Sequence, residues 1–518
     1  MLKKYPFHSF LIGLFPVIFL FAENVGQTDC ADVLLPLVVM ELVVGVLLLV
    51  VYLILKNWAA SGIYVSMLAV WFCSYGCFYN ISIGLTLNNV VLGRERWLLP
   101  IWGLLFVFGL VCLIKFHRRI PDFNKALNVV ISALTGLLLL KTGMSYYILH
   151  GNGNSVHREI RSQRHHLAVN EPNDIKSMYL PSIYYIILDS YSASSVLKDE
   201  YDYDNISFIS YLKENRFYVA ENSHSNYAFT FLSLCSSLNL DYLNVIFDLN
   251  GRKGNDYSDI KRSIEYNSIA EYLSQRGYET VKLGSWWSPT ATGKGKTWRA
   301  DCIATEFNIA LLKMTILRPF VEQMISPLLR HGVISVFDRI AELAQSDKPH
   351  FVFAHIICPH PPYIFGENGE EIGLLQSAAM SLQPKVSYLN QVKYINKKVE
   401  ALVDTLLKDS NSPPIIVLQA DHGSGYIFRP MHNRSVPDDT ERDVKFLKAQ
   451  FKILNAYYLP GGGGKYLYDS ISPVNTFRVI LNAYFGEHLD LLPDRNYYST
   501  FVTPFSFMDA TDKIKNDY

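Results

Sequence analysis

Five long apolar segments in the first 150 residues constrain the fold of this chain more than any other feature. They are nearly free of charge and cover residues 7–22, 33–55, 60–79, 97–115 and 126–149. Each is about long enough to cross a hydrocarbon core of roughly 30 Å as an α-helix. A mean hydropathy of +0.12 with only 18% charged residues fits a chain that lies partly in lipid. The sequence therefore predicts a transmembrane domain of five helices over residues 1–150, integral to the membrane.

The basic residues predict which side of the membrane the rest of the chain occupies. Lys3 and Lys4 precede the first segment, Lys56 follows the second, and a basic cluster at 115–125 separates the fourth from the fifth. The positive-inside rule places these alternate loops in the cytoplasm. An odd number of spans then places everything after residue 150 outside. The first segment also resembles a signal peptide, but we find no small-x-small cleavage site near Phe21-Ala22-Glu23 and expect an uncleaved helix.

Residues 151–180 form a polar linker that contains several arginines and histidines. A solvated connector explains this composition, and a helix lying on anionic headgroups is the alternative. The chain as a whole has 47 basic and 47 acidic residues, so no overall field favours nucleic acid as a partner. Its seven cysteines show no paired spacing that would indicate a metal or redox motif.

From about residue 181 to 518, short β-rich runs alternate with helical patterns. Strands are predicted at 183–188, 217–219, 280–283, 351–353, 415–418 and 453–458, and helices near 204–215, 231–240, 259–275, 386–408 and 473–484. Apolar strands that alternate with helices indicate a mostly parallel sheet covered on both faces. We therefore predict an α/β domain for this part of the chain.

Polar residues follow three of the predicted strands. Asp189 follows 183–188, His355 and His360 follow 351–353, and Asp421 and His422 follow 415–418. Ligands of open parallel sheets bind at the carboxyl ends of the strands. Carboxylates and imidazoles gathered at one edge are what a divalent metal site with oxygen and nitrogen ligands requires. The plainer alternative is that each acid caps the turn that follows it.

A nucleophile candidate lies where a polar run becomes helical. Thr230 ends the segment 222–230 and begins an apolar helical pattern, so its hydroxyl is expected at a helix N-terminus. Free amides and the positive helix end favour an alkoxide and a phosphate oxygen at this place. A threonine hydroxyl needs a base or a metal to act as a nucleophile. An ordinary N-cap is the alternative for Thr230, and Ser233 is the fallback nucleophile.

These residues together resemble a known family. The motifs are LeuAspSer at 188–190, SerAsnTyrAlaPheThr at 225–230, ProHisProProTyr at 359–363 and AspHisGly at 421–423. With five spans before them, they resemble the membrane-bound sulfatase-like branch of the alkaline phosphatase superfamily. Lipoteichoic acid synthases and lipid A phosphoethanolamine transferases belong to that branch. The resemblance implies an extracytoplasmic catalytic domain of sulfatase-like α/β fold over 181–518.

The resemblance also implies roles for single residues. Asp189, Thr230, Asp421 and His422 would bind the principal metal ion, zinc or manganese, with Thr230 as the nucleophile. His360 would contact substrate or a second metal.

Other histidines are weaker candidates. His432 could be a further ligand of a second metal, or a loop histidine. His224 and the loop from Trp286-Trp287 to Trp298 could line the substrate pocket, with aromatic core as the alternative.

Two departures from the family pattern matter for function. Asp189 stands where these transferases usually have glutamate; it is shorter but supplies the same hard oxygen. The Cys-x-Pro-Ser-Arg type motif that sulfatases convert to formylglycine is absent, since Cys235 is followed by Ser-Ser-Leu-Asn. Sulfate ester hydrolysis by the aldehyde hydrate mechanism is therefore not expected.

The expected function is transfer of phosphoethanolamine or phosphoglycerol from a membrane phospholipid to a hydroxyl of a cell-envelope glycan or lipid. The transfer would proceed through a phosphothreonine intermediate. The protein itself is expected in the cell (inner or plasma) membrane. The alternative is a sulfatase-like hydrolase of phosphodiesters or sulfuric esters at the membrane surface. A non-enzymatic membrane scaffold would be favoured only if ligand residues were missing.

Overall fold

The computed structural model describes residues 5–82, 86–87, 90–91, 95–115, 120–151, 180–247, 256–284, 286–293, 295–299, 304–372, 383–428 and 441–515. The chain forms two compact units. The first comprises residues 1–154 and 302–325, and the second comprises residues 155–301 and 326–518. We call them the membrane unit and the catalytic unit. The linker predicted at 151–180 lies almost entirely outside the described residues.

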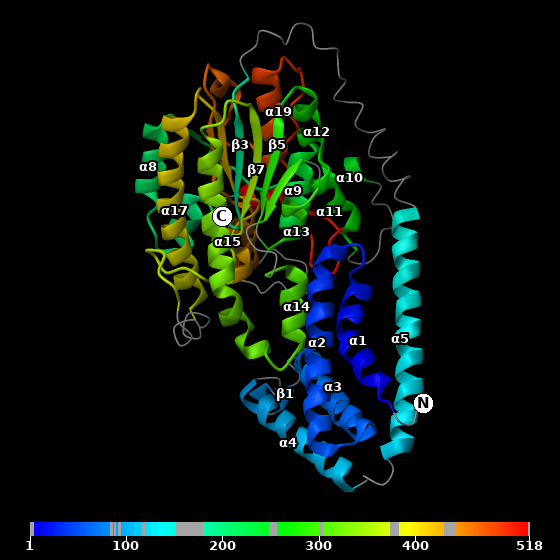
Figure 1. Ribbon diagram of the computed structural model, residues 1–518. Coiled ribbons are helices and arrows are strands. Elements are labelled where there is room, and N and C mark those ends of the chain that lie inside the picture. Colours follow the sequence, from blue (N-terminus) through cyan, green and yellow to red (C-terminus); the bar gives the residue numbers. More distant parts are fainter. Residues whose placement is uncertain are drawn as a thin grey trace. The chain divides into compact units, whose positions relative to one another are not determined.

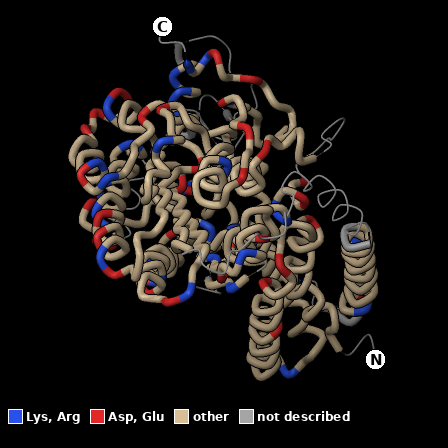
Figure 2. Tube along the Cα trace, turned by 90° about the horizontal axis from the view of Figure 1, so that it is seen from above, with Lys and Arg blue, Asp and Glu red and all other residues tan. Residues whose placement is uncertain are grey.

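The membrane unit contains the predicted five helices (Figure 1). They are α1 (Phe7–Glu23), α2 (Cys30–Leu55), α3 (Trp58–Ser82), α4 (Glu95–Lys115) and α5 (Ile120–Gly151). Four of them are long and apolar enough to cross a membrane, and α1 is a shorter apolar helix of 17 residues. Few charged residues lie along these helices, whereas many lie on the catalytic unit (Figure 2). The prediction of a membrane-integral helical bundle is confirmed, with α1 as its shortest member.

A buried polar network holds α1 in the bundle. Nδ1 of His8 lies 2.7 Å from the Ser66 hydroxyl of α3, and Nε2 lies 3.0 Å from Oδ1 of Asn124 of α5. The backbone N–H of His8 donates to Oδ1 of Asn128 at 2.8 Å. Polar pairs between helices add to van der Waals packing in lipid. These contacts connect α1 to α3 and α5.

The membrane unit also includes a segment from the middle of the chain, which the sequence assigned to the catalytic domain. The segment carries α14 (Glu306–Met314), η4 (Arg318–Phe320) and the start of α15 (Val321–Leu343). Gly76 of α3 allows its close approach, because a Cβ there would lie 2.2 Å from the Lys313 carbonyl oxygen. The Ile316 N–H donates to the Phe72 carbonyl at 2.9 Å. The short pair β1 (Thr86–Leu87) and β2 (Val90–Val91) lies between α3 and α4 in the chain.

The catalytic unit is built on a seven-stranded sheet of order β4-β9-β8-β3-β7-β5-β6. The strands are β3 (Ile183–Leu188), β4 (Tyr218–Val219), β5 (Glu279–Gly284), β6 (Lys296–Arg299), β7 (His350–Ile356), β8 (Ile415–Gln419) and β9 (Asn455–Tyr458). Strand β9 pairs antiparallel with both β4 and β8, and the other four pairs in this sheet are parallel. The predicted mostly parallel sheet is thus confirmed. Strand β6, which the sequence did not predict, extends one edge.

Helices cover both faces of the sheet (Figure 1). One face carries α8 (Ile206–Glu214) and α17 (Pro384–Asp409), and the other carries α9 (Thr230–Leu238), α11 (Ser258–Glu265), α12 (Ser268–Gln275) and α19 (Pro473–Tyr484). The single helix predicted at 259–275 is two helices, because the Asn267 side chain accepts from the Ala270 N–H at 2.8 Å and starts α12. The remaining elements are α7 (Ser194–Tyr201), α10 (Leu243–Ile246), α13 (Ser288–Ala291), η5 (Gly425–Ile427), α18 (Glu441–Phe451), η6 (Gly463–Tyr466), β10 (Tyr497–Tyr498), β11 (Met508–Asp509) and α20 (Thr511–Lys515).

Candidate metal centre

Three adjacent parallel strands bring the predicted ligands together. The central strand β3 pairs with β7 on one side and with β8 on the other. Asp189 directly follows β3, and Asp421 and His422 lie two and three residues after β8. The carboxyl ends of parallel strands meet at one edge of the sheet. Residues more than 230 positions apart in the chain therefore become neighbours.

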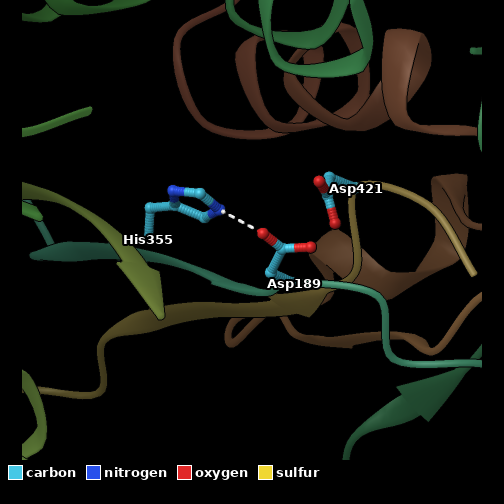
Figure 3. Close-up of side chains that lie close together, drawn as sticks. All are labelled: Asp189, His355 and Asp421. Atoms are coloured by element: carbon cyan, nitrogen blue, oxygen red, sulfur yellow. Dashed lines mark ion pairs between the residues drawn. The ribbon is translucent and has the colours of Figure 1, made fainter. Parts of the chain in front are cut away.

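Asp189, His355 and Asp421 form a compact, buried cluster (Figure 3). Each offers one possible ligand atom, and these atoms all lie within 4.8 Å of one another. Nε2 of His355 lies 3.4 Å from Oδ2 of Asp189. Among the described residues, His355 Nε2 and Asp421 Oδ2 are buried without a hydrogen-bond partner. Buried carboxylates require a cation or donors nearby, so this donor set fits a divalent metal ion.

His422 turns one ring nitrogen toward the same cluster. Its Nε2 lies 3.8 Å from Oδ1 of Asp189 and 3.6 Å from Oδ2 of Asp421. Its Nδ1 lies 2.8 Å from the Gly423 carbonyl oxygen, which can only accept. The proton of a neutral ring therefore belongs on Nδ1, and the lone pair on Nε2 is left for a metal.

Charges in the cluster oppose the effect of burial on two of its groups. Burial alone raises the pKa of Asp189, but the nearby imidazoles of His360, His355 and His422 outweigh it and hold that pKa below its ordinary range. For His422, burial lowers the pKa, but the carboxylates of Asp421 and Asp189 raise it above the ordinary value. A metal ion bound at Nε2 of His422 would compete with a proton at that atom.

Thr230 is the first residue of α9, and its hydroxyl faces His422. Oγ1 of Thr230 lies 3.3 Å from Nε2 of His422. The N-cap of α9 is Phe229, so Thr230 does not serve as the ordinary N-cap that was the alternative. Its hydroxyl lies at the positive end of a nine-residue helix. Ser233, the fallback nucleophile, is buried one turn further along the same helix.

His360 lies beside this group and is only partly buried. Its backbone N–H donates to the Asp189 carbonyl at 3.1 Å, and its ring centroid lies 6.3 Å from that of His422. Nδ1 of His360 lies 2.6 Å from the Pro361 carbonyl oxygen, which can only accept, so Nδ1 is a donor and Nε2 is the basic nitrogen of a neutral ring.

The other predicted residues have different outcomes. His432 lies outside the described residues. His224 forms an isolated bridge with Lys452, and burial together with Lys452 and Lys515 lowers the pKa of its imidazole to about 4. The Trp287 ring packs against the hydrophobic core and meets the His355 ring edge-on at 5.5 Å. Trp287 is therefore part of the aromatic core and also lies beside the cluster.

Two residues near the cluster have contacts that the sequence did not reveal. His355 was expected at this edge of the sheet but had no ligand role. Ser190 adopts φ +65°, its N–H donates to Oδ1 of Asp421 at 3.1 Å, and its hydroxyl donates to Oδ1 of Asp189 at 3.0 Å. Such a left-handed non-glycine conformation is often found at functional sites. Ser190 thus orients both carboxylates.

The second ring nitrogen of His355 also has a hydrogen-bond partner. Its Nδ1 lies 3.1 Å from the Thr290 hydroxyl of α13. The loop around α13 is tied down by the fully buried Lys282, whose ammonium donates to the carbonyls of Glu265 and Thr292. Burial lowers the pKa of Lys282 to about 8. A side chain that bonds the second nitrogen of a ligand histidine orients its ring.

Two solved structures that match this chain are a periplasmic domain and an integral membrane protein. The C-terminal periplasmic domain of EptC from Escherichia coli is 14% identical, with 64% of this chain and 94% of that chain covered and a TM-score of 0.41. The integral membrane protein lipooligosaccharide phosphoethanolamine transferase A (EptA) from Neisseria meningitidis is 12% identical, with 93% and 96% covered and a TM-score of 0.39.

Comparison of sequences gives a family. No curated protein matches the chain, but the family model described as Sulfatase matches residues 181–470, and with them all the described residues of the cluster. Because this match covers more than half of the chain, the protein belongs to the sulfatase family and is an enzyme of the alkaline phosphatase superfamily, as its motifs suggested.

Proposed function

We propose that this protein is a metal-dependent transferase that moves phosphoethanolamine or phosphoglycerol from a membrane phospholipid to a hydroxyl of a cell-envelope glycan or lipid. The observation that carries the proposal is the Thr230 hydroxyl, 3.3 Å from His422 Nε2 at the start of α9 and next to a buried cluster of metal-binding type. A hydroxyl in this position is suited to nucleophilic attack on phosphorus. The membrane unit gives the reason to prefer a lipid donor.

Asp189, Asp421, His422 and Thr230 are proposed to hold zinc or manganese, with His355 as a further ligand. Two carboxylates, two imidazoles and a hydroxyl are donors that both metals accept. The bound ion would act as a Lewis acid that lowers the pKa of the Thr230 hydroxyl and offsets charge on the phosphate.

In the first half of the reaction, Oγ1 of Thr230 attacks phosphorus in line with the diacylglycerol oxygen. The bond from phosphorus to that oxygen breaks, and His360, which enters this step protonated on both ring nitrogens, donates its Nε2 proton to the leaving diacylglycerol oxygen. The headgroup phosphate remains on Thr230, whose own proton is lost to solvent. The free amides at the start of α9 favour the charge of the phosphate oxygens.

In the second half, Nε2 of His360 takes the proton of the acceptor hydroxyl as that oxygen attacks the phosphothreonine. The bond between phosphorus and Oγ1 breaks, Oγ1 regains a proton from solvent, and Thr230 and His360 return to their starting states. Such a two-step transfer needs no nucleotide, which suits a site outside the cell. We propose the cell (inner or plasma) membrane as the location, with the catalytic unit on the extracytoplasmic side.

The test is the fate of the headgroup. Purified full-length protein in vesicles of phosphatidylethanolamine or phosphatidylglycerol should release diacylglycerol and gain a headgroup phosphate, which mass spectrometry should locate on Thr230. Without an acceptor, release should stop near one event per enzyme molecule. No diacylglycerol from either lipid, or an adduct on another residue, would contradict the proposal.

A hydrolase is the second candidate, because the matching family is described as Sulfatase. It would use the same residues but pass the intermediate to water. Sustained release of phosphoethanolamine or glycerol phosphate over many turnovers would favour it. Hydrolysis of sulfuric esters through formylglycine is not proposed, because Thr230 cannot be converted to that aldehyde.

A further inference from the structure

The membrane unit contains a cavity of about 440 Å³ that the proposed reaction does not use. It lies between α3 and α4, with Ile12 of α1 and Leu127 of α5 completing its wall. Ligand pockets commonly have volumes of about 300–1,000 Å³. The cavity, here called the α3–α4 groove, is therefore large enough for part of a lipid.

The α3–α4 groove follows the surface of α3. Its lining residues on α3 run from Ile63 to Phe78. At a rise of 1.5 Å per residue this stretch measures about 22 Å, most of a hydrocarbon core of roughly 30 Å. A volume of this size with an apolar lining is sufficient for part of a flexible hydrocarbon chain.

Polar groups in the lining are already paired. The Ser66 hydroxyl lies 2.7 Å from Nδ1 of His8, and the Ser74 hydroxyl donates to the Val70 carbonyl at 2.5 Å. The indole N–H of Trp71 donates to the Trp102 carbonyl, and that of Trp102 donates to the Trp71 carbonyl, both at 3.0 Å. A ligand in the groove therefore meets hydrocarbon and aromatic rings and no unpaired polar atom among these four groups.

The same two tryptophans make the groove a preformed site. Their reciprocal bonds tie α3 to α4, and the Trp71 and Trp102 rings lie 4.6 Å from those of Phe106 and Phe78. Rings that are held in place lose little freedom when a ligand binds. At Gly109 the helices approach closely, because a Cβ there would lie 3.1 Å from Sδ of Met67.

The groove is continuous with the lipid-facing surface of the bundle. Val70 and Leu105, which line it, are 51% and 53% exposed. In a bilayer such side chains contact acyl chains. Water is not stable in an apolar space at this depth, and an empty space forfeits dispersion contacts. We propose that the α3–α4 groove binds one acyl chain of a membrane phospholipid, as a built site independent of the transfer reaction.

The test compares two glycines of α4. Gly109→Leu places a side chain in the groove, where the nearest atom is the flexible end of Met67. Gly103→Leu is the matched control, because a Cβ at Gly103 meets nothing within 4 Å and Gly103 does not line the groove. Excluding about two methylene groups of a bound chain should weaken binding about tenfold.

Full-length protein is reconstituted in vesicles of phosphatidylethanolamine and phosphatidylglycerol, extracted in mild detergent and examined by native mass spectrometry. Wild type and Gly103→Leu should retain one phospholipid per chain, and Gly109→Leu should lose most of it. Equal retention by Gly109→Leu would overturn the proposal.

A second measurement does not depend on how the variants fold. A phospholipid with a photoreactive acyl chain should label Met67 or Ser74 of the wild-type protein, and about a tenfold excess of unlabelled phospholipid should suppress this labelling. Labelling at the exposed Leu104 of α4 should fall only in proportion to the dilution of the probe by the added unlabelled phospholipid. The proposal fails if groove and surface positions respond alike, whether or not the protein transfers a headgroup.

Discussion

The Thr230 hydroxyl lies 3.3 Å from Nε2 of His422, and Nδ1 of the same ring lies 2.8 Å from the Gly423 carbonyl oxygen. The carbonyl thus fixes which nitrogen carries the proton, and the other nitrogen faces the hydroxyl and both buried carboxylates. A nucleophile and metal-binding groups meet at one point because α9 starts beside the end of β8.

Replacing Thr230 tests its role as the nucleophile. Thr230→Ala should lower the rate of headgroup transfer by roughly 10⁴-fold or more, since no other group takes its place. Thr230→Ser keeps a hydroxyl and should retain measurable transfer. Ser233→Ala, on the same helix, should be close to wild type. Diacylglycerol release from labelled lipid measures all three, and an active Thr230→Ala would rule out the phosphothreonine.

The metal content tests the cluster. The double variant Asp421→Ala, His422→Ala removes two proposed ligands and should lose the ion and the activity while the five-helix bundle stays folded. His355→Ala should weaken metal binding, because Nε2 of His355 belongs to the same cluster. The exposed His488→Ala is the control for histidine loss. Elemental analysis that found equal metal in the double variant and the wild type would show the assignment to be wrong.

Thr290 is predicted to affect metal binding indirectly, because it orients the ring of His355. Thr290→Val keeps the shape but removes the hydroxyl that lies 3.1 Å from Nδ1 of His355. Loss of such a partner typically costs roughly 10- to 100-fold in metal affinity. Thr290→Ser should restore it. Thr292→Val is the matched control, because that hydroxyl bonds Glu265 and Ser288 rather than His355. Metal titration of the wild type and these three variants distinguishes a role of Thr290 in orienting His355 from general damage to the loop.

Membrane topology can be tested with fusions. Five spans and basic cytoplasmic loops predict that a reporter active only in the cytoplasm is silent after Tyr518. The same reporter fused after Lys56, between α2 and α3, should be active. A folded, active reporter at Tyr518 would contradict both the odd number of spans and an extracytoplasmic transfer reaction.

Much of the fold could be predicted because it depends on local patterns. Long apolar runs indicated the bundle, and β3, β7 and β8 were apparent as short apolar strands followed by polar residues. Strand β6 was missed because Lys296 to Arg299 has no apolar alternation and gains its place only by pairing with β5. The 302–325 segment was missed for a similar reason. Its place in the membrane unit depends on contacts such as Gly76 against Lys313, which no local pattern records.

The part of the site that depends on strand register could not be predicted from the sequence. His355 pairs with Ile187, two residues before Asp189, so both side chains lie on the same face of adjacent strands. A register that pairs Ile187 with His355, 168 positions away, cannot be read from either strand alone. The left-handed conformation of Ser190 is equally hidden, because serine seldom adopts it and only its contacts with Asp421 and Asp189 account for it.

The pH dependence of thermal stability follows from the raised pKa of His422. A group whose pKa is higher in the folded than in the unfolded protein contributes stability at low pH and loses it as the pH rises through the folded value. The ordinary pKa of histidine is about 6.5, so this loss should begin above that value.

Metal binding has the opposite trend. The ion requires an unprotonated Nε2, so the metal affinity falls about tenfold per pH unit below the pKa of His422. The increase in Tm on adding metal should therefore grow between about pH 6 and about pH 8. His422→Asn should flatten this growth, and His488→Asn should leave it unchanged; a metal-induced shift that is the same at all pH values in the wild type would exclude His422 as a ligand.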